Sequence, residues 1–182
     1  MSTLVDPTSV TPTTVTRAII FTDVVRSTET LEQMGVDAWA EVIEHHRRSI
    51  DAIVAAAGGV VAAFTGDGYM VAFDELPAAI NSALRLQWAL WAQRELGVRI
   101  GLAAGPVRPM QDGNYLGLAV NRASRLCDAC GPGEVLIDRS AWVEAIAALT
   151  LPPAEVITLN SRGFREPIRA VRSRALSDGS LP

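Results

Sequence analysis

Two aspartates, Asp23 and Asp67, carry a negative charge at positions where an uncharged turn residue would be enough to form the local structure. Asp23 comes near the end of a β-branched apolar run, 17–25, and Asp67 lies between two glycines in "FTGDGYMVAF" (64–73). The run predicts a buried strand, and the Gly-Asp-Gly segment predicts the turn of a β-hairpin. If the strand lies beside the hairpin, the two carboxylates meet at one end of a sheet and repel each other unless a cation lies between them. Hard oxygen ligands favour Mg²⁺ or Mn²⁺. Each aspartate alone is better explained as a turn or strand-end residue, but the pair favours a metal site.

The short segment after Asp23 leads from the strand into a helix. It reads "VVRST" and offers Ser27 and Thr28 as helix N-caps. The N–H groups at a helix start can bind phosphate oxygens, and the glycines that flank Asp67 allow a large ligand to approach the main chain. With two cations beside it, such a loop suits in-line phosphoryl transfer.

A second pair of polar residues lies on a predicted helix, 118–129. Asn121 and Arg125 are four positions apart in "NYLGLAVNRASRL" and therefore share one helix face. The pair is either an ordinary solvated face or a functional pair, in which the amide orients a ribose and the guanidinium meets charge on a phosphate.

The remaining pattern predicts an α+β fold close to a ferredoxin-like βαββαβ unit, with extra C-terminal αβ elements. We expect one domain at 17–174, a flexible lead at 1–16 rich in Thr, Ser and Pro, and a flexible tail at 175–182. The other predicted elements are a helix at 37–57, a hairpin at 60–73, a helix at 77–96, strands at 98–107 and 133–138, a short helix from Ser140, and an edge strand at 167–172.

The composition excludes several classes of protein. The 182 residues are 49% apolar and 20% charged, with a net charge of −4, which indicates a globular chain without general affinity for nucleic acid or anionic membranes. All 16 basic residues are arginine. No apolar run reaches membrane-spanning length and no signal peptide is evident, so we expect a cytoplasmic protein.

The only two cysteines, Cys127 and Cys130, would share one face if both lay on a helix. A zinc site needs more ligands than this pair offers, and the two histidines lie far away in the sequence. A redox pair is an alternative, but two ordinary helix cysteines are favoured because no partner motif accompanies them.

Taken together, these motifs resemble the class III nucleotidyl cyclases, the catalytic domains of adenylate and guanylate cyclases. The resemblance runs through residues 17–172 in family order. It rests on "IIFTDVVRSTETLEQMG", "GGVVAAFTGDGYMVAF", "VRIGLAAGPV", "NYLGLAVNRASRL", "GPGEVLID" and "RGFREPIRAVR".

The resemblance implies a role for each motif. Asp23 and Asp67 would bind two divalent cations, Mn²⁺ or Mg²⁺, with help from the Val24 carbonyl. Asn121 and Arg125 would act on the transition state. The main chain of Val25, Arg26, Ser27 and Thr28 would hold the β- and γ-phosphates, and Arg162 falls where the family has a lysine that binds the triphosphate.

The resemblance also implies an assembly and a reaction. The aspartates of one chain and the Asn–Arg pair of another would build each site, so a head-to-tail homodimer with two composite sites is expected. The ribose 3′-oxygen of a nucleoside triphosphate would attack the α-phosphorus and release pyrophosphate. No residue is marked as a dedicated general base.

The predicted base-reading positions depart from the family. Adenylate cyclases carry Lys and Asp or Thr where this chain has Ala63 and Asn114, and guanylate cyclases usually carry Glu at the first position. Alanine offers no side-chain hydrogen bond. The absence of the purine-reading pair, in a nearly bare catalytic module, resembles the branch that makes cyclic UMP or cyclic CMP in bacterial antiphage (Pycsar) signalling, which would act through a cyclic-nucleotide-sensing effector.

Three hypotheses therefore follow from the sequence. The first is a pyrimidine nucleotide cyclase, the second is an ATP cyclase with an unusual base-reading pair, and the third is an inactive nucleotide-binding dimerisation module. Bulky Phe64 and Tyr115 lie beside the base-reading positions, where they either narrow a pocket toward a pyrimidine or pack in the core and hairpin.

Overall fold

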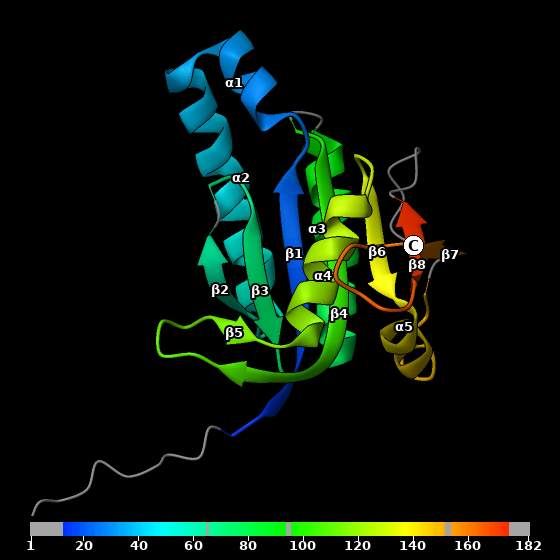
Figure 1. The fold of residues 1–182 in the computed structure, drawn as a ribbon. Helices are drawn as coiled ribbons and strands as arrows, with labels where there is room; N and C mark the ends of the chain where they lie inside the picture. The colour runs from blue at the N-terminus through cyan, green and yellow to red at the C-terminus, as the bar shows by residue number, and fades with distance from the viewer. Residues whose placement is uncertain (1–12, 65, 94–95, 152–153, 175–182) are drawn as a thin grey trace, which may run out of the picture.

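The fold is built on one mixed sheet flanked by helices (Figure 1). A computed structural model describes residues 13–64, 66–93, 96–151 and 154–174. Four strands form the first half of the sheet in the order β2-β3-β1-β4, with each neighbouring pair antiparallel. Their bounds are β1 Val15–Val24, β2 Val60–Phe64, β3 Tyr69–Phe73 and β4 Val98–Pro109. This is the predicted ferredoxin-like arrangement, so the predicted α+β fold class is confirmed.

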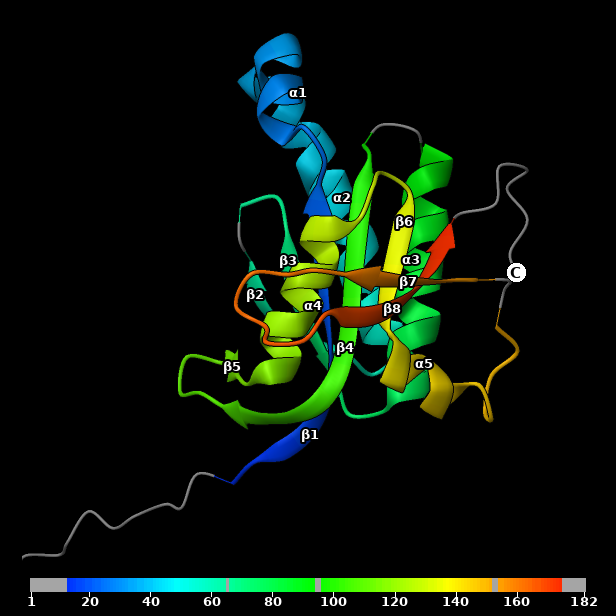
Figure 2. The same cartoon turned by 45° about the vertical axis from the view of Figure 1, so that its right-hand side comes forward.

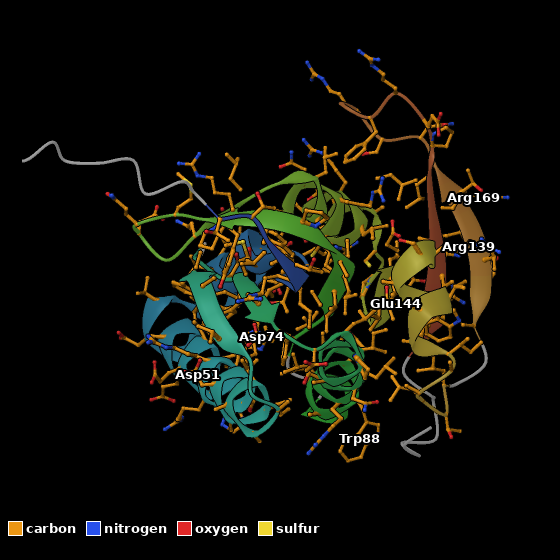
Figure 3. The ribbon with its side chains drawn as sticks, turned by 90° about the horizontal axis from the view of Figure 1, so that it is seen from below. Asp51, Asp74, Trp88, Arg139, Glu144 and Arg169 are labelled. Carbon is orange, nitrogen blue, oxygen red and sulfur yellow. The ribbon has the colours of Figure 1, made fainter. Side chains whose placement is uncertain are left out.

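Three helices belong to this first half: α1 (Ser27–Met34), α2 (Val36–Ala56) and α3 (Leu76–Gln93). Seen from below, α2 and α3 lie on one side of the sheet and α4 lies on the other (Figure 3). Strand residues alternate between the two sides because successive side chains of a strand point to opposite faces. Ile20 and Val71 join the core beneath α2 and α3, whereas Ile19 and Met70 join the core beneath α4.

The helix that carries Asn121 and Arg125, α4 (Leu118–Ala129), lies directly on β4. Gly101 of β4 makes this approach possible, since a Cβ at that position would lie 2.2 Å from the Cys127 nitrogen and 2.3 Å from the Ala123 oxygen. A side chain at position 101 would therefore push α4 away from the sheet and move the residues on it.

The C-terminal half extends the sheet beyond β4, as Figure 2 shows. It adds β5 (Tyr115–Leu116), β6 (Glu134–Asp138), α5 (Arg139–Ala145), β7 (Glu155–Leu159) and β8 (Ile168–Arg174). The sequence prediction of an edge strand at 167–172 is wrong, because β8 lies between β6 and β7. Strand β7 forms the edge, and the sequence analysis did not predict it.

Element boundaries also differ at the N-terminal side. Strand β1 begins at Val15, two residues inside the predicted lead; residues 1–12 and the predicted tail at 175–182 lie outside the described residues. The predicted caps Ser27 and Thr28 lie inside α1, and Arg26 takes the N-cap position without a side-chain cap bond. Among the described helices, none combines the length and apolar character needed to cross a membrane.

Candidate active site

The pairing of β1 with β3 brings the two aspartates to one end of the sheet. Thr22 pairs with Tyr69, and the Tyr69 N–H donates a hydrogen bond to Thr22 Oγ1 at 3.2 Å. Asp23 follows Thr22 directly, and Asp67 precedes Tyr69 by two residues. Both aspartates therefore lie where β1 ends and β3 begins, beside the start of α1 (Figure 1).

The two carboxylates have different surroundings. Asp67 lines an open pocket of about 280 Å³ together with Ser27, Thr28, Trp39 and other residues. Asp23 instead forms an ion pair with an arginine of β4: Oδ2 accepts from Arg99 Nε at 2.7 Å and lies 2.6 Å from Nη2. Burial lowers the pKa of the Arg99 guanidinium, but the hydrogen bond and charge of Asp23 outweigh burial and raise it.

The oxygen atoms at this end of the sheet fit a hard divalent cation. Asp23 and Asp67 supply carboxylates, and the Val24 carbonyl lies beside them in the chain. Within the described part of the chain, no cluster of three or more His, Cys, Asp or Glu side chains forms a closed metal cage. A site with few protein ligands is typical of Mg²⁺, which keeps waters and binds substrate phosphates.

The start of α1 has a backbone suited to binding an anion. Arg26 adopts a left-handed conformation with φ 59° and ψ 36°, the only positive φ of a non-glycine residue in the described chain. A left-handed residue next to helical ones turns successive N–H groups toward one point, where an anion can bind. The N–H of Val25 already donates to the Gly97 carbonyl at 2.7 Å, so the N–H donors left at this turn begin beyond Val25.

Arg125 and Arg162 line a second open pocket, of about 390 Å³, between the last turns of α4 and the segment after β7. Arg125 Nη1 donates to Asp128 Oδ2 at 3.0 Å, and Asp128 lines the same pocket. Asn121 is exposed one turn earlier on α4. The structure thus gathers the basic residues in one pocket and places Asp67 in another, and the two pockets share no lining residue.

The two predicted base-reading residues lie in different elements, Ala63 in β2 and Asn114 in the loop between β4 and β5. Asn114 is held in the hairpin loop, where its Nδ2 donates to Asp112 Oδ2 at 2.8 Å and its N–H donates to Asp112 Oδ1 at 3.0 Å. These hydrogen bonds lower the pKa of the Asp112 carboxyl. Ala63 and Tyr115 both pack against the core beneath α4.

Phe64 faces the other side of the sheet. It pairs with Tyr69 in the β2–β3 ladder, and the two ring centroids are 5.0 Å apart. Phe64 contacts the Tyr69 ring but is 51% exposed, so it is not a core residue, and Tyr115 is the bulky residue on the same side as Ala63.

Residues 11–144 of the chain match the family described as the adenylate and guanylate cyclase catalytic domain. The chain belongs to this family. An uncharacterised protein of Mycobacterium tuberculosis is 34% identical over 128 residues, which are 69% of this chain and 44% of that protein. An adenylate cyclase of Streptomyces coelicolor is 30% identical over 139 residues, 76% of this chain and 36% of that protein.

A solved structure extends the likeness beyond the matched segment. The adenylate/guanylate cyclase/hydrolase of Silicibacter pomeroyi superposes with a TM-score of 0.80 at 26% identity, covering 91% of this chain and 99% of that one. This chain spans less than half the length of the curated relatives it matches. The likeness of fold covers 91% of this chain and so extends beyond the matched segment into the C-terminal part.

Two arginines of the cyclase domain were missed by the sequence reading. Arg99 is the one charged residue in the apolar segment 98–107. A single charge in a predicted buried strand could have marked it as a functional candidate. Arg122 gave no such signal because it lies in a polar stretch of α4. Its guanidinium carbon is 5.7 Å from the Phe164 ring centroid, and its Nη1 donates to Asp138 Oδ2 at 3.1 Å. Arg122 thus connects α4 to the loop that carries Arg162.

His46 of α2 and Tyr69 of β3 form a pair of buried polar side chains. His46 of α2 is 2% exposed, and its ring centroid is 6.1 Å from that of Tyr69. Both ring nitrogens of His46 and the Tyr69 hydroxyl lack a hydrogen-bond partner within the described chain. Burial lowers the pKa of His46 to about 4, although the charge of Asp67 opposes the shift, and burial raises the pKa of Tyr69 to about 12.

The cysteines of the cyclase domain are buried and unbridged. Cys127 Sγ donates to the Arg99 carbonyl at 3.5 Å and Cys130 Sγ donates to the Ile100 carbonyl at 3.0 Å. Burial raises the pKa of the Cys127 thiol and raises that of Cys130 to about 12. Buried, hydrogen-bonded thiols of this kind favour a structural role, although Cys130 is the C-cap residue of α4 and not a helix residue as predicted.

Proposed function

We propose that this chain is a nucleotidyl cyclase that converts a nucleoside triphosphate into a 3′,5′-cyclic mononucleotide and pyrophosphate. The observation that carries the proposal is the arrangement of charge in a domain of this family. Two aspartates lie beside an anion-binding helix start, and Arg125 and Arg162 share a separate pocket. The first group would hold the cations and the leaving pyrophosphate, and the second would meet the charge that develops at the α-phosphorus.

Each group then has a defined task. Asp23 and Asp67 would hold two divalent cations, Mn²⁺ or Mg²⁺, with the Val24 carbonyl. Bound there, the cations would favour loss of the 3′-hydroxyl proton and stabilise the pyrophosphate leaving group. The N–H groups at Ser27 and Thr28 would hold the β- and γ-phosphates.

The pocket lined by Arg125 and Arg162 would bind the phosphate groups of the nucleotide. Arg125 would donate hydrogen bonds to the α-phosphate oxygens, where charge reorganises as the 3′-oxygen attacks. Asn121 would orient the ribose, and Arg162 would bind the triphosphate with its planar fork of donors. The 3′-proton passes to water or to substrate in this scheme, since no side chain is assigned as a general base.

The active unit in this proposal is a homodimer. The two pockets of one chain share no lining residue, so a head-to-tail pair would bring the aspartates of one copy to the basic pocket of the other. The arm formed by the end of β4 and β5 reaches past the sheet (Figure 1). Met110, Leu116 and Leu118 are 44%, 61% and 70% exposed around this arm, which is an apolar surface that a second copy would cover.

We propose a pyrimidine as the base, with UTP or CTP as the substrate. Ala63 cannot read a base edge, whereas Asn114 donates one amide N–H to Asp112 and keeps its second N–H and its carbonyl oxygen for that task. Tyr115 lies on the same side of the sheet as Ala63 and would narrow the space for a purine. The product would then be a second messenger in antiphage defence, made in the cytoplasm and sensed by a separate effector.

A second candidate is ATP cyclisation. It is favoured by one observation, the 30% identity to the Streptomyces coelicolor protein named adenylate cyclase. An inactive nucleotide-binding module is the remaining alternative, and the presence of Asp23, Asp67, Asn121 and Arg125 in the family order argues against it.

Incubation of the purified protein with ATP, GTP, CTP and UTP separately, with Mn²⁺ or Mg²⁺, tests both the reaction and the base. Products are identified by mass and chromatography. We expect cyclic UMP or cyclic CMP, and no product from Asp23→Ala or Asp67→Ala. Cyclic AMP as the main product would favour the second candidate. No cyclic product with any nucleotide, from folded dimer with either metal, would contradict the proposed function.

A further inference from the structure

The segment that carries Arg162 crosses over α4 on its way from β7 to β8 (Figure 2). Within it the Phe164 N–H donates to the Ser161 carbonyl at 3.3 Å, which closes a tight turn. Arg162 and Gly163 are the central residues of this turn, and Gly163 has φ 93°, in the positive region that glycine favours at the third position of a turn. The place of Arg162 therefore depends on how the two ends of the turn, Ser161 and Phe164, are held.

Phe164, at the end of this turn, is held by Arg122 of α4. The Arg122 guanidinium carbon lies 5.7 Å from the Phe164 ring centroid, within the distance at which a cation and an aromatic face attract each other. Arg122 is itself fixed, because its Nη1 donates to Asp138 Oδ2 at 3.1 Å. The Asp138 side chain is 6% exposed, and its Oδ1 accepts from the Ser140 N–H at 2.9 Å. Arg122 therefore links a buried carboxylate at the end of β6 to the aromatic ring at the end of the turn.

Resting on the proposed function, we propose that Arg122 is a positioning residue that sets the place of Arg162 in the pocket for the triphosphate. Arg122 holds Phe164, and the tight turn passes that position on to Arg162, two residues earlier. Helix α4 thereby places both arginines of the pocket, Arg125 directly and Arg162 through Arg122. Guanidinium donors bind phosphate oxygens in a fixed geometry, so a displaced turn would weaken the contact of Arg162 with the triphosphate.

Two other roles for Arg122 predict different results. If Arg122 bound phosphate itself, its loss and the loss of Arg162 would add as free energies, because the two contacts would be independent. The geometry favours positioning over this role, since Arg122 contacts Asp138 and Phe164 and lies outside the lining that the structure describes for the pocket. If Arg122 only stabilised the fold, its loss would lower stability and leave the phosphate affinity of the folded protein unchanged. A double-mutant cycle with Arg162 therefore separates the three roles.

The probe is inorganic triphosphate, which has the phosphate chain of the substrate without its ribose or base. Its dissociation constant is measured by isothermal titration calorimetry on the full-length protein with Mg²⁺ present, and KM and kcat for the preferred nucleotide are measured in parallel. The variants are Arg122→Gln, Arg122→Lys, Phe164→Leu, Arg162→Ala and the double variant of Arg122→Gln with Arg162→Ala. Arg17→Gln is the matched control, because Arg17 also pairs with an aspartate, Asp74 at 2.8 Å, near the start of β1. Thermal melting and dimer mass show which variants are folded.

We expect Arg122→Gln to raise the dissociation constant of triphosphate and the KM several-fold, by no more than Arg162→Ala does, with kcat little changed. Phe164→Leu should do the same, because it keeps an apolar side chain but removes the ring. Arg122→Lys should have a smaller effect, since it keeps a cation for the ring, and Arg17→Gln should have none. In the Arg162→Ala background, Arg122→Gln should cause no further loss of affinity.

Three results would overturn the positioning role of Arg122 while leaving the proposed function intact. The first is an unchanged triphosphate affinity in folded Arg122→Gln, or in folded Arg122→Lys and Phe164→Leu if Arg122→Gln does not fold. The second is the same loss of affinity on Arg122→Gln in the Arg162→Ala background as in the wild type, which would show that Arg122 binds phosphate itself. The third is a wild-type protein that forms a cyclic nucleotide but does not bind triphosphate. A wild-type protein that forms no cyclic product would instead overturn the proposed function, and the positioning role with it.

Discussion

Arg125 of α4 and Arg162 of the segment after β7 line the same pocket, although distant parts of the chain carry them. Asp128 lines the same pocket and accepts a hydrogen bond from Arg125 Nη1 at 3.0 Å. The cation–π contact of Arg122 with Phe164 also connects the segment that carries Arg162 to α4. The pocket therefore depends on how α4 and the C-terminal strands pack, and its two arginines can be tested separately.

The first prediction separates transition-state contacts from ground-state binding. Arg125→Ala should lower kcat and kcat/KM together, by about 10²–10³-fold, because the contact forms where charge reorganises. Arg162→Ala should mainly raise KM, because it would bind the triphosphate in the ground state as well. Steady-state kinetics on the preferred nucleotide measure both.

Arg139→Ala is the control for this comparison, since Arg139 begins α5, away from the pocket (Figure 3). It should behave as the wild type. If Arg125→Ala changes KM alone and leaves kcat at the wild-type value, the assignment of the α4 pair is wrong, and Asn121 and Arg125 are an ordinary solvated helix face.

The second prediction concerns the composite site. An Asp67→Ala chain mixed with an Arg125→Ala chain should recover part of the wild-type activity, since one of the two sites in a mixed dimer keeps all its groups. Each variant alone should be inactive. Heterodimers are verified with two different affinity tags, and mixed dimers without any recovered activity would show that each chain carries a complete site.

The third prediction concerns Asp128. Its carboxylate places a negative charge in the pocket proposed for the triphosphate and occupies Arg125. Asp128→Asn should therefore lower KM several-fold with kcat little changed, because an exposed ion pair of this kind contributes only about 0–1 kcal/mol. A raised KM in this variant would indicate instead that Asp128 orients Arg125 for substrate.

The fourth prediction is a pH dependence of stability caused by His46. Folding holds its pKa near 4, below the unfolded value of 6.5, so the folded state keeps a neutral ring while the unfolded state takes up a proton. The contribution to stability is complete above pH 6.5 and falls by about 1.4 kcal/mol for each pH unit as the pH drops toward 4. Stability at higher pH is unaffected by this group.

Urea unfolding at several pH values between 7 and 4.5 measures this effect. His46→Gln should lose less stability on acidification than the wild type. His45→Gln is the matched control, because the neighbouring His45 is exposed on the same helix. Equal pH slopes for the wild type and His46→Gln would show that His46 is not the group responsible.

The sequence by itself determined those helices, strands and turns that are marked by a regular spacing of apolar residues or by characteristic turn residues. The apolar run ending near Asp23, the Gly-Asp-Gly turn and the helix at 118–129 all form as predicted, because their periodicity and their turn residues are local signals. The order of these elements also placed Asp23 and Asp67 at one end of the sheet, since ferredoxin-like connectivity leaves β1 beside β3.

Only the tertiary structure decided which partners those side chains have. Strand β7 was missed and β8 was expected at an edge, because strand order depends on packing of the whole sheet and not on the composition of one segment. The pairing of Asp23 with Arg99 requires the β1–β4 register and the close approach of α4 at Gly101, and the shared pocket of Arg125 and Arg162 requires the C-terminal strands to fold back over α4. Contacts between segments that are distant in the chain leave no periodic trace in the sequence, so they are fixed only when the layers pack together.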